Sequence, residues 1–192
     1  MASVLSHPAV PLAIACWTPS LRRPSLLIAG ALLSAAPDLD VIGYWAGVPY
    51  DAWCGHRGFT HSIAFALCCA LALAPALARW CGVPVRRVVA YFWAAMASHG
   101  VVDMATNGGY GIALFWPFST ARMFWPCNPI EVATLSVGAF FSEHGMVVLQ
   151  SELIWLWLPA ALIGGVGLLR TRRRPGDHSR GEKPPERFIS RS

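Results

Sequence analysis

SIAFALCCALALAPALA, at residues 62–78, contains no charged side chain. A membrane-spanning α-helix needs about 20 consecutive, mostly apolar residues, and this run approaches that length between His61 and Arg79. Four further stretches are equally free of charge, namely residues 1–21, 24–37, 88–102 and 153–169. Their repetition predicts a chain that crosses a membrane several times.

The composition agrees with a membrane protein. The chain has 192 residues, of which 13% are charged, whereas soluble domains carry about 25% charged residues. The formal net charge of +5 is local, because eight of the 15 basic residues lie in the last 23 positions. These values exclude an ordinary soluble domain and a disordered chain, and they give no support to a nucleic-acid partner.

The apolar stretches predict an all-α, polytopic membrane helical bundle with about five membrane helices. We expect these helices at residues 8–19, 24–37, 60–79, 87–104 and 151–170. The first two are short and contain Pro11, Pro19 and Pro24, so they could instead form a tilted or re-entrant hairpin. Pro75 should kink the third helix.

Two segments outside these helices have a different composition. Glycine, proline and tryptophan are scattered through residues 105–150, which predicts a long outer loop with one short helix near 129–142. From residue 171 onward the chain is rich in Arg, Pro, Gly and Ser. We therefore expect a membrane-embedded domain at 1–170 and a flexible basic tail at 171–192.

The basic residues predict the orientation in the membrane. With five alternating helices, 13 of the 15 basic residues fall on one side, and only Arg57 and Arg122 fall on the other. Basic loops remain in the cytoplasm. We expect a multi-pass protein of the bacterial inner membrane with a cytoplasmic C-terminus and the loops 38–60 and 105–150 on the periplasmic side.

Histidines and aspartates from four segments gather on that outer side. Imidazole and carboxylate groups together suit Zn, Mn or Fe, and ionisable groups at a bilayer tend to pair, bind ions or serve function. Each residue alone also has a structural interpretation, as a helix end, a cap or a hydrogen-bonded pair. The candidate metal ligands are His7, Asp38, Asp40, His56, His61, His99 and Asp103. Their number predicts two metals, or one metal with further carboxylates that orient the imidazoles.

The motifs that carry these residues resemble a known family. They are Ser-His at 6–7, Pro-Asp-Leu-Asp at 37–40, His-Arg-Gly-Phe-Thr-His-Ser at 56–62 and Ser-His-Gly-Val-Val-Asp at 98–103. In this combination the chain resembles the YdjM-like family of inner-membrane proteins, which have a metal-dependent hydrolase assignment. By its motifs, the resemblance implies functional positions at Asp38, Asp40, His56, Arg57, His61, His99 and Asp103. A looser likeness to zinc phospholipases C favours phosphoester chemistry.

A metal-activated water is the mechanism that fits these residues. A bound metal lowers the pKa of its water from 15.7 to about 7, and Asp40 or Asp103 could act as general base. Arg57 is a candidate for binding a substrate phosphate, or else an interfacial arginine whose side chain reaches toward water. A site at the membrane surface favours a small-molecule or lipid-derived envelope substrate.

Other classes of function compete with a hydrolase. The His/Asp cluster could handle ions or protons, as in transporters, although transporter sites usually lie near the middle of the bilayer. It could also hold a structural metal. The basic cluster at Arg170 and Arg172–Arg174 could contact anionic membrane lipid, but a topological role is commoner. The sequence leaves the oligomeric state open.

Six cysteines are present without a Cys-x-x-Cys pair, which gives no support to a zinc ribbon or a thioredoxin motif. Cys54 and Cys127 are the two that lie on the outer side of this topology. They could form a disulfide in an oxidising periplasm and tie the long loop over the metal site, or they could remain as two unpaired thiols.

Overall fold

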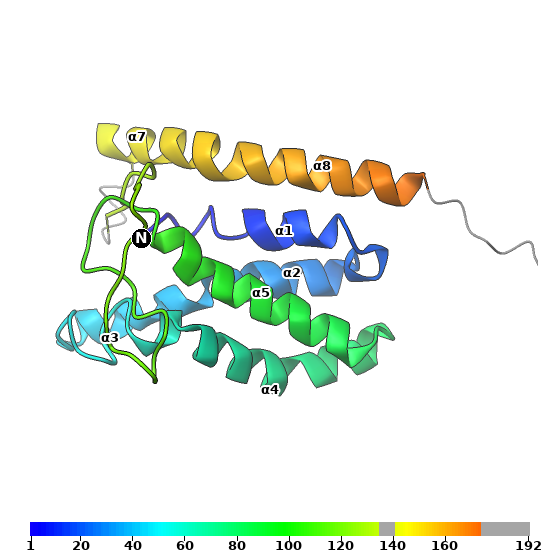
Figure 1. Ribbon diagram of the computed structural model, residues 1–192, viewed down its shortest axis with the longest axis horizontal. Coiled ribbons are helices and arrows are strands. Elements are labelled where there is room, and N and C mark those ends of the chain that lie inside the picture. The colour runs from blue at the N-terminus through cyan, green and yellow to red at the C-terminus, as the bar shows by residue number, and fades with distance from the viewer. Residues whose placement is uncertain (135–140, 174–192) are drawn as a thin grey trace, which may run out of the picture.

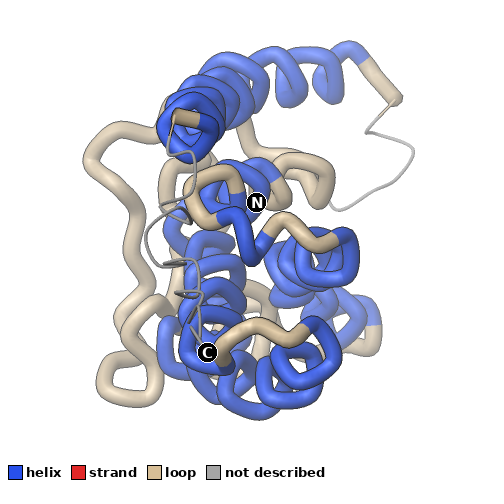
Figure 2. The backbone as a smooth tube through the Cα atoms, turned by 90° about the vertical axis from the view of Figure 1, so that its right-hand side faces the viewer, coloured by secondary structure: helices blue, strands red, loops and turns tan. Residues whose placement is uncertain are grey.

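The computed structural model describes residues 1–134 and 141–173. Within these residues the secondary structure is helical, and pairing between extended segments is limited to two isolated bridges, Thr106 with Ile130 and Ile112 with Met123. The helices lie side by side as a bundle, with loops gathered at one end (Figures 1 and 2). The predicted all-α class is therefore confirmed.

In the described residues the bundle consists of five helical rods. The first is the short α1, and the second joins α2 and α3 through a 3-10 turn, η2. The third and fourth are α4, which follows the 3-10 turn η3, and α5; the last joins α7 and α8 through a π-helical turn, η4. Their bounds are α1 Ala9–Ala15, α2 Pro24–Ala35, η2 Ala36–Asp40, α3 Val41–Trp45, η3 Phe59–His61, α4 Ile63–Cys81, α5 Val85–Asp103, α7 Glu143–Glu152, η4 Leu153–Trp157 and α8 Leu158–Arg172.

Three rods of the described chain are long and apolar enough to cross a membrane: Pro24–Trp45, Ile63–Cys81 and Glu143–Arg172. The predicted count of about five membrane helices is thus not confirmed. α1 has only 7 residues, too few for a bilayer about 30 Å thick. α5 has 19 residues, but the arginines at its start and the polar residues at its end lower its hydropathy.

Two predicted boundaries were wrong. The last helix begins at Glu143 rather than at 151, so the expected loop 105–150 ends earlier. The first ten residues of this helix include Glu, His, Gln and Ser, whose polarity made the helix hard to predict. Its buried positions are Gly145, Val148 and Glu152. The second helix does not stop at 37, because a 3-10 turn with Pro37 at its start leads into α3. Of the short helix expected near 129–142, residues 135–140 lie outside the described residues, and residues 129–134 and 141–142 are not helical.

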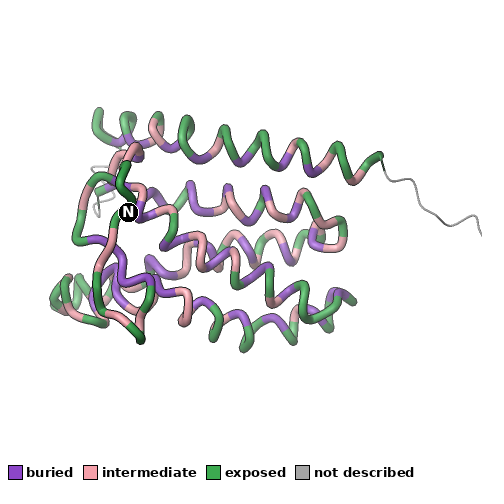
Figure 3. The backbone as a smooth tube through the Cα atoms, in the orientation of Figure 1, coloured by how far each residue is buried: buried purple, intermediate pink, exposed green. Residues whose placement is uncertain are grey.

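Small side chains let the central helices pack closely. α5 packs against both α4 and α2, and every fourth residue on one face of α4 is a buried alanine, at positions 66, 70, 74 and 78. Such small residues allow two backbones to approach each other in a membrane. Figure 3 shows the burial on the inward faces of the rods and the exposure on their outer faces. Pro75 lies within α4, which continues through it.

The loops at one end of the bundle form a folded cap. The Arg122 guanidinium donates hydrogen bonds to the main-chain oxygens of Tyr50, Ala52 and His56 at 3.0–3.1 Å, which joins the long loop to the loop between α3 and η3. Cys54 and Cys127 are both free thiols. The structure therefore contains the unpaired alternative and not the disulfide.

Candidate metal site

Four segments meet beneath this cap. His7 comes from the turn before α1, Asp38 from η2, His61 from η3, and His99 and Asp103 from the last turns of α5. All five side chains are at most 4% exposed. Residues that are far apart in the sequence thus share one buried volume, as the pattern of polar residues predicted.

The two central histidines face each other through the same ring nitrogen. Nε2 of His61 lies 3.0 Å from Nε2 of His99. His99 Nδ1 lies 2.7 Å from the Ser34 carbonyl oxygen, which can only accept, so Nδ1 carries the hydrogen and Nε2 presents a lone pair. His61 Nδ1 lies 3.3 Å from Asp40 Oδ2 and is oriented in the same way. Two lone pairs at this distance require a positive charge between them.

Two carboxylates complete this group. Asp38 Oδ1 is 3.3 Å from His99 Nε2 and 3.6 Å from His61 Nε2. Asp103 Oδ2 is 3.7 Å from His99 Nε2 and 3.8 Å from His61 Nε2. Ligands bound tetrahedrally to zinc at about 2.0–2.1 Å lie about 3.3 Å from one another. The four side chains are therefore spaced as the ligands of one ion would be.

His7 adds a third imidazole at the edge of the group. Its ring stacks on His99 with centroids 3.7 Å apart, and its Nε2 lies 3.7 Å from Asp103 Oδ1 and 3.8 Å from Asp38 Oδ2. Burial lowers the pKa of His7 to about 3. His7 is therefore neutral at physiological pH, which is the form that binds a metal.

The pKa of His61 moves in the opposite direction. Burial by itself lowers it, but the nearby carboxylates of Asp38 and Asp40 outweigh burial and raise the pKa to about 9. A proton held at His61 supplies the positive charge that the two opposed nitrogens need. A cation would replace this proton, because a metal ligand must be deprotonated.

Asp40 contacts two imidazole rings, those of His56 and His61, through their Nδ1 atoms. Its Oδ1 lies 2.6 Å from His56 Nδ1, and its Oδ2 accepts hydrogen bonds from Thr60 Oγ1 at 2.6 Å and from the Arg57 main-chain N–H at 3.2 Å. Carboxylates in this position fix the orientation and tautomer of metal-binding histidines. Asp40, His56 and His61 also form a second group with ligand atoms close enough to hold a metal.

Arg57 is fully buried, at 0% exposure, so the interpretation as an interfacial arginine reaching toward water was wrong. Its Nη1 donates to the Gly108 carbonyl at 2.7 Å and its Nη2 to Thr106 Oγ1 at 3.0 Å, while Nε lies 3.7 Å from Asp103 Oδ2. Its φ of 64° places a non-glycine residue in the left-handed region. The guanidinium thus joins the cap to the cluster; its predicted contact with a substrate phosphate stays a prediction.

Several buried polar atoms of this region lack a hydrogen-bond partner. Buried polar groups without partners are costly and are rare in native proteins. Among the described residues they concentrate here: His7 Nδ1 and Nε2, both oxygens of Asp38, Arg57 Nε and Asp103 Oδ2. A divalent cation would satisfy one nitrogen of His7 and the carboxylate oxygens of Asp38 and Asp103 among them, so the residues present fit a metal ion.

The sequence did not reveal the groups that support this cluster. Thr60, which lies inside the motif at 56–62 but was not predicted to orient a ligand, contacts His61 Nδ1, and the Ser34 carbonyl oxygen contacts His99 Nδ1. Glu152 is 1% exposed and accepts hydrogen bonds from the hydroxyls of Ser3 at 2.7 Å and Ser6 at 2.6 Å. Its position as an acid at the start of an apolar helix was a signal for this role. His144 lies apart, with Nε2 3.1 Å from the Val132 carbonyl oxygen.

Comparison with known proteins shows what the chain is similar to. A family model described as YdjM inner membrane protein matches residues 1–174. A protein of Escherichia coli (strain K12) described as inner membrane protein YbcI is 38% identical over 175 residues, which are 91% of this chain and 100% of that protein. No solved structure matches. The family match includes every segment that contributes to the buried cluster.

Proposed function

The chain belongs to the YdjM family of inner membrane proteins, as its motifs predicted, and from that premise we propose that it is a membrane-bound, metal-dependent hydrolase. Its substrate class is a phosphoester or a lipid-derived component of the envelope. The observation that carries the proposal is the pair of opposed Nε2 atoms, 3.0 Å apart, flanked by two buried carboxylates without a cationic partner in hydrogen-bond contact. This arrangement supports a bound cation, which would replace the proton between the two nitrogens and give the Asp38 and Asp103 oxygens a partner.

The four central side chains would hold the metal, and His7 is available as a fifth donor. Their mixture of imidazole and carboxylate suits zinc, with manganese and iron as alternatives. Such a metal supplies an activated water at neutral pH, because it lowers the pKa of water from 15.7 to about 7. One ion at Asp38, His61, His99 and Asp103 would give a partner to the carboxylate oxygens of Asp38 and Asp103 that lack one. A second could use Asp40 and His56.

The two candidate bases differ in their surroundings. Both oxygens of Asp40 are engaged with His56, Thr60 and the Arg57 main chain, so Asp40 acts as an orienting group. Asp103 accepts one hydrogen bond, from the Ala2 main-chain N–H at 2.7 Å, through Oδ1, and its Oδ2 has none. Asp103 is therefore the candidate base in a site whose ion is held by Asp38, His61 and His99; as a fourth ligand through Oδ2 it would not be free to take a proton from water.

Metal analysis of detergent-purified protein tests the site. We expect about one or two bound divalent ions, and their loss in a His61→Ala/His99→Ala double variant. His144→Ala is the matched control, because this exposed histidine lies outside the cluster, and it should retain the metal. Absence of metal from the wild-type protein, under conditions that preserve the fold, would contradict the proposal.

A structural metal is the second candidate, and the burial of the cluster favours it, since His99 and Asp103 are both 0% exposed. Structural zinc sites have a closed ligand shell, whereas catalytic sites keep an open position. Assays of the metal-loaded protein with phosphodiester and phosphomonoester substrates separate the two. Hydrolysis that the double variant lacks supports the enzyme; metal without hydrolysis of any ester supports the structural site.

The site belongs on the periplasmic side in this proposal. The arginines at positions 22, 23, 79, 86, 87, 170 and 172 lie at one end of the bundle, near the α1–α2 and α4–α5 turns and the end of α8, and the capping loops lie at the other (Figure 1). The positive-inside rule assigns the arginine-rich end to the cytoplasm. A substrate would then come from the outer leaflet of the inner membrane or from the periplasm.

A further inference from the structure

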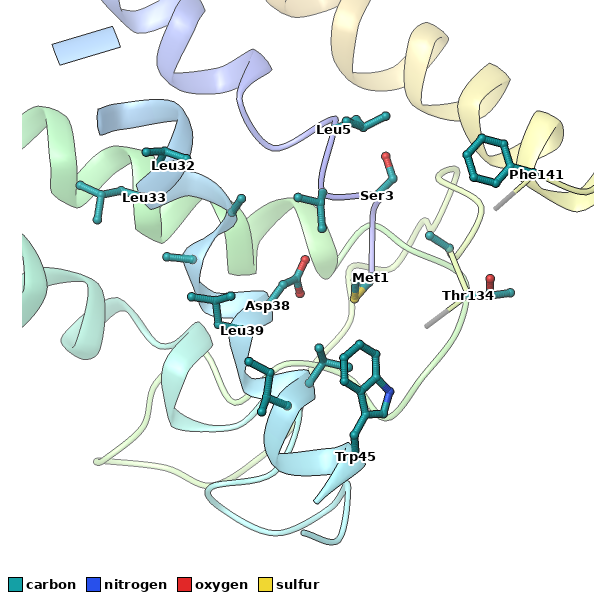
Figure 4. A pocket seen from close by; sticks show the side chains of 16 residues that line it. Met1, Ser3, Leu5, Leu32, Leu33, Asp38, Leu39, Trp45, Thr134 and Phe141 are labelled. Carbon is teal, nitrogen blue, oxygen red and sulfur yellow. The ribbon is translucent and has the colours of Figure 1, made fainter. Parts of the chain in front are cut away.

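A cavity of about 790 Å³ lies beside the metal cluster, between the N-terminal segment and the rod formed by α2, η2 and α3 (Figure 4). This volume is within the range of about 300–1,000 Å³ that encloses small molecules. Its walls are mostly apolar and include Val4, Leu5, Leu32, Leu39, Ile42 and Trp45. Among the described residues that line it, Asp38 has the only ionisable side chain.

Asp38 connects this cavity to the cluster. The carboxylate is directed from η2 toward the N-terminal segment in Figure 4, while its Oδ1 lies 3.3 Å from His99 Nε2. Neither oxygen has a hydrogen-bond partner. A molecule that fills the apolar cavity would therefore end at the same carboxylate that we assign to the metal.

The outer wall of the cavity lies on a candidate membrane span, Pro24–Trp45. Leu32, Leu39 and Ile42 on this span are 67%, 65% and 59% exposed, and the protein itself does not cover them. In an inner membrane protein such side chains contact lipid chains. A ligand that enters past them comes from the bilayer, because a polar solute would have to cross an apolar wall.

We infer that this cavity holds an acyl chain of a membrane phospholipid and places the lipid's phosphoester at Asp38. That this ester is the substrate rests on the proposed hydrolase function. The binding of the acyl chain in the cavity does not depend on that function. In the hydrolysis, the oxygen of water forms a new bond to phosphorus and the ester P–O bond breaks. One proton of the water goes to the oxygen of the released alcohol, and the other remains on the new phosphate hydroxyl.

Photolabelling in a defined bilayer tests the inference. The full chain is placed in nanodiscs that contain a phospholipid with a diazirine at the end of one acyl chain, and labelled peptides are identified by mass spectrometry. We expect the label on residues 32–45 to exceed that on residues 162–169 of α8, which face lipid without lining the cavity. Equal labelling of the two segments would overturn the inference.

Two isoleucines of the same rod provide a matched pair of variants. Ile42 lines the cavity and Ile28 does not, yet they are 59% and 60% exposed, so a tryptophan at either position disturbs little packing. Each methylene excluded from an apolar site costs about fourfold in affinity, and an indole in the cavity excludes at least two. Ile42→Trp should lower labelling of 32–45 about tenfold, whereas Ile28→Trp should leave it unchanged. Equal labelling in both variants would contradict an occupied cavity.

The His61→Ala/His99→Ala variant separates this inference from the proposed function. Labelling of 32–45 should persist in it, because the acyl chain binds to apolar walls and not to the metal. If the wild-type protein binds no metal but its labelling still falls with Ile42→Trp, the hydrolase proposal fails and the lipid site stands. If metal is bound and the labelling is uniform, the lipid site fails alone.

Discussion

At the residue scale, Arg57 combines a buried charge with an unfavourable backbone conformation. Its guanidinium lies beside Asp103, and removal of one member of a buried ion pair costs about 3–5 kcal/mol. Arg57→Ala should lower the free energy of unfolding by about that amount. Arg57→Gly loses the same charge but relieves the φ of 64°, so it should be about 1 kcal/mol more stable than the alanine variant.

Thermal unfolding in detergent measures both variants of Arg57. Arg79→Ala is the control, because this arginine is exposed in the last turn of α4, and its unfolding temperature should stay near that of the wild type. If alanine and glycine at position 57 unfold at the same temperature, the backbone conformation contributes nothing to stability.

Asp40 tests the difference between a ligand and the group that orients it. Asp40→Asn keeps the shape of the side chain but weakens the contacts with His56 and His61, so metal affinity should fall about 10- to 100-fold without being abolished. Titration with a competing chelator measures this change. Asp51→Asn, at an exposed position, should leave affinity unchanged. Complete loss of metal with Asp40→Asn would instead make Asp40 a direct ligand.

At this scale the sequence predicted residues that the structure brings together, but it did not distinguish the different contacts that each of them makes. Histidine and aspartate spaced along apolar helices are conspicuous, because an ionisable group near a bilayer is costly. Which nitrogen of His61 faces Asp40 depends on the angle between η3 and α5, and that angle is set by packing. The burial of Arg57 likewise depends on how the loop around Thr106 folds, for which the sequence contains no periodic signal.

At the scale of elements, Gly100 sets the distance between α5 and η3. A Cβ at position 100 would lie 2.5 Å from the His61 carbonyl oxygen, so Gly100→Ala must push η3 away from α5. Overpacking of this kind costs about 1–3 kcal/mol, and it should also weaken metal binding by separating His61 from His99. Thermal unfolding and metal content measure the two effects.

Gly165 is the matched control for Gly100. It lies inside α8, where a Cβ added to it would meet nothing within 4 Å, so Gly165→Ala should raise stability by about 0.5–1 kcal/mol through helix propensity. Metal content should be unchanged. An unperturbed metal site in Gly100→Ala would show that η3 can move without separating the ligands.

Glu152 links the last rod to the N-terminal segment that contains His7. Its carboxylate accepts hydrogen bonds from the hydroxyls of Ser3 and Ser6, and an uncharged amide in its place would offer one acceptor oxygen instead of two. Glu152→Gln should therefore cost about 1–3 kcal/mol, the penalty of unsatisfied buried polar groups. Thermal unfolding measures this loss against Glu143→Gln, an exposed position on the same rod. Equal unfolding temperatures would contradict the role of Glu152.

Apolar runs predicted the positions of elements better than their ends. The predicted helices 60–79 and 87–104 correspond to α4 and α5 within a few residues, since charge-free stretches bounded by arginine define them. The helix Glu143–Glu152 was not predicted, because its polar residues lower its mean hydropathy and only a narrow face of it is buried. The continuation of α2 into α3 was not predicted for another reason. Pro37 indicates the end of a helix, but here it lies at the start of a 3-10 turn that keeps the direction of the rod.

At the scale of the whole molecule, the two ends of the bundle carry different kinds of ionisable residue. The buried His/Asp cluster and its cap occupy one end, and arginines are concentrated at the other (Figure 1). Such a separation is what a positive-inside topology needs, because basic residues hold one end in the cytoplasm. It leaves the end with the buried ionisable groups free to meet the bilayer surface or the periplasm.

A reporter fused after residue 174 tests this topology. Green fluorescent protein should fluoresce there and alkaline phosphatase should be inactive, because the rod Glu143–Arg172 ends on the predicted cytoplasmic side. Neutralising the arginines at positions 170 and 172–174 should disturb this orientation or reduce insertion, since positive charges close to the end of a span determine its direction. Neutralising Arg122, on the opposite side, should not change it. An active phosphatase fusion in the wild-type chain would reverse the topology and move the metal site to the cytoplasmic face.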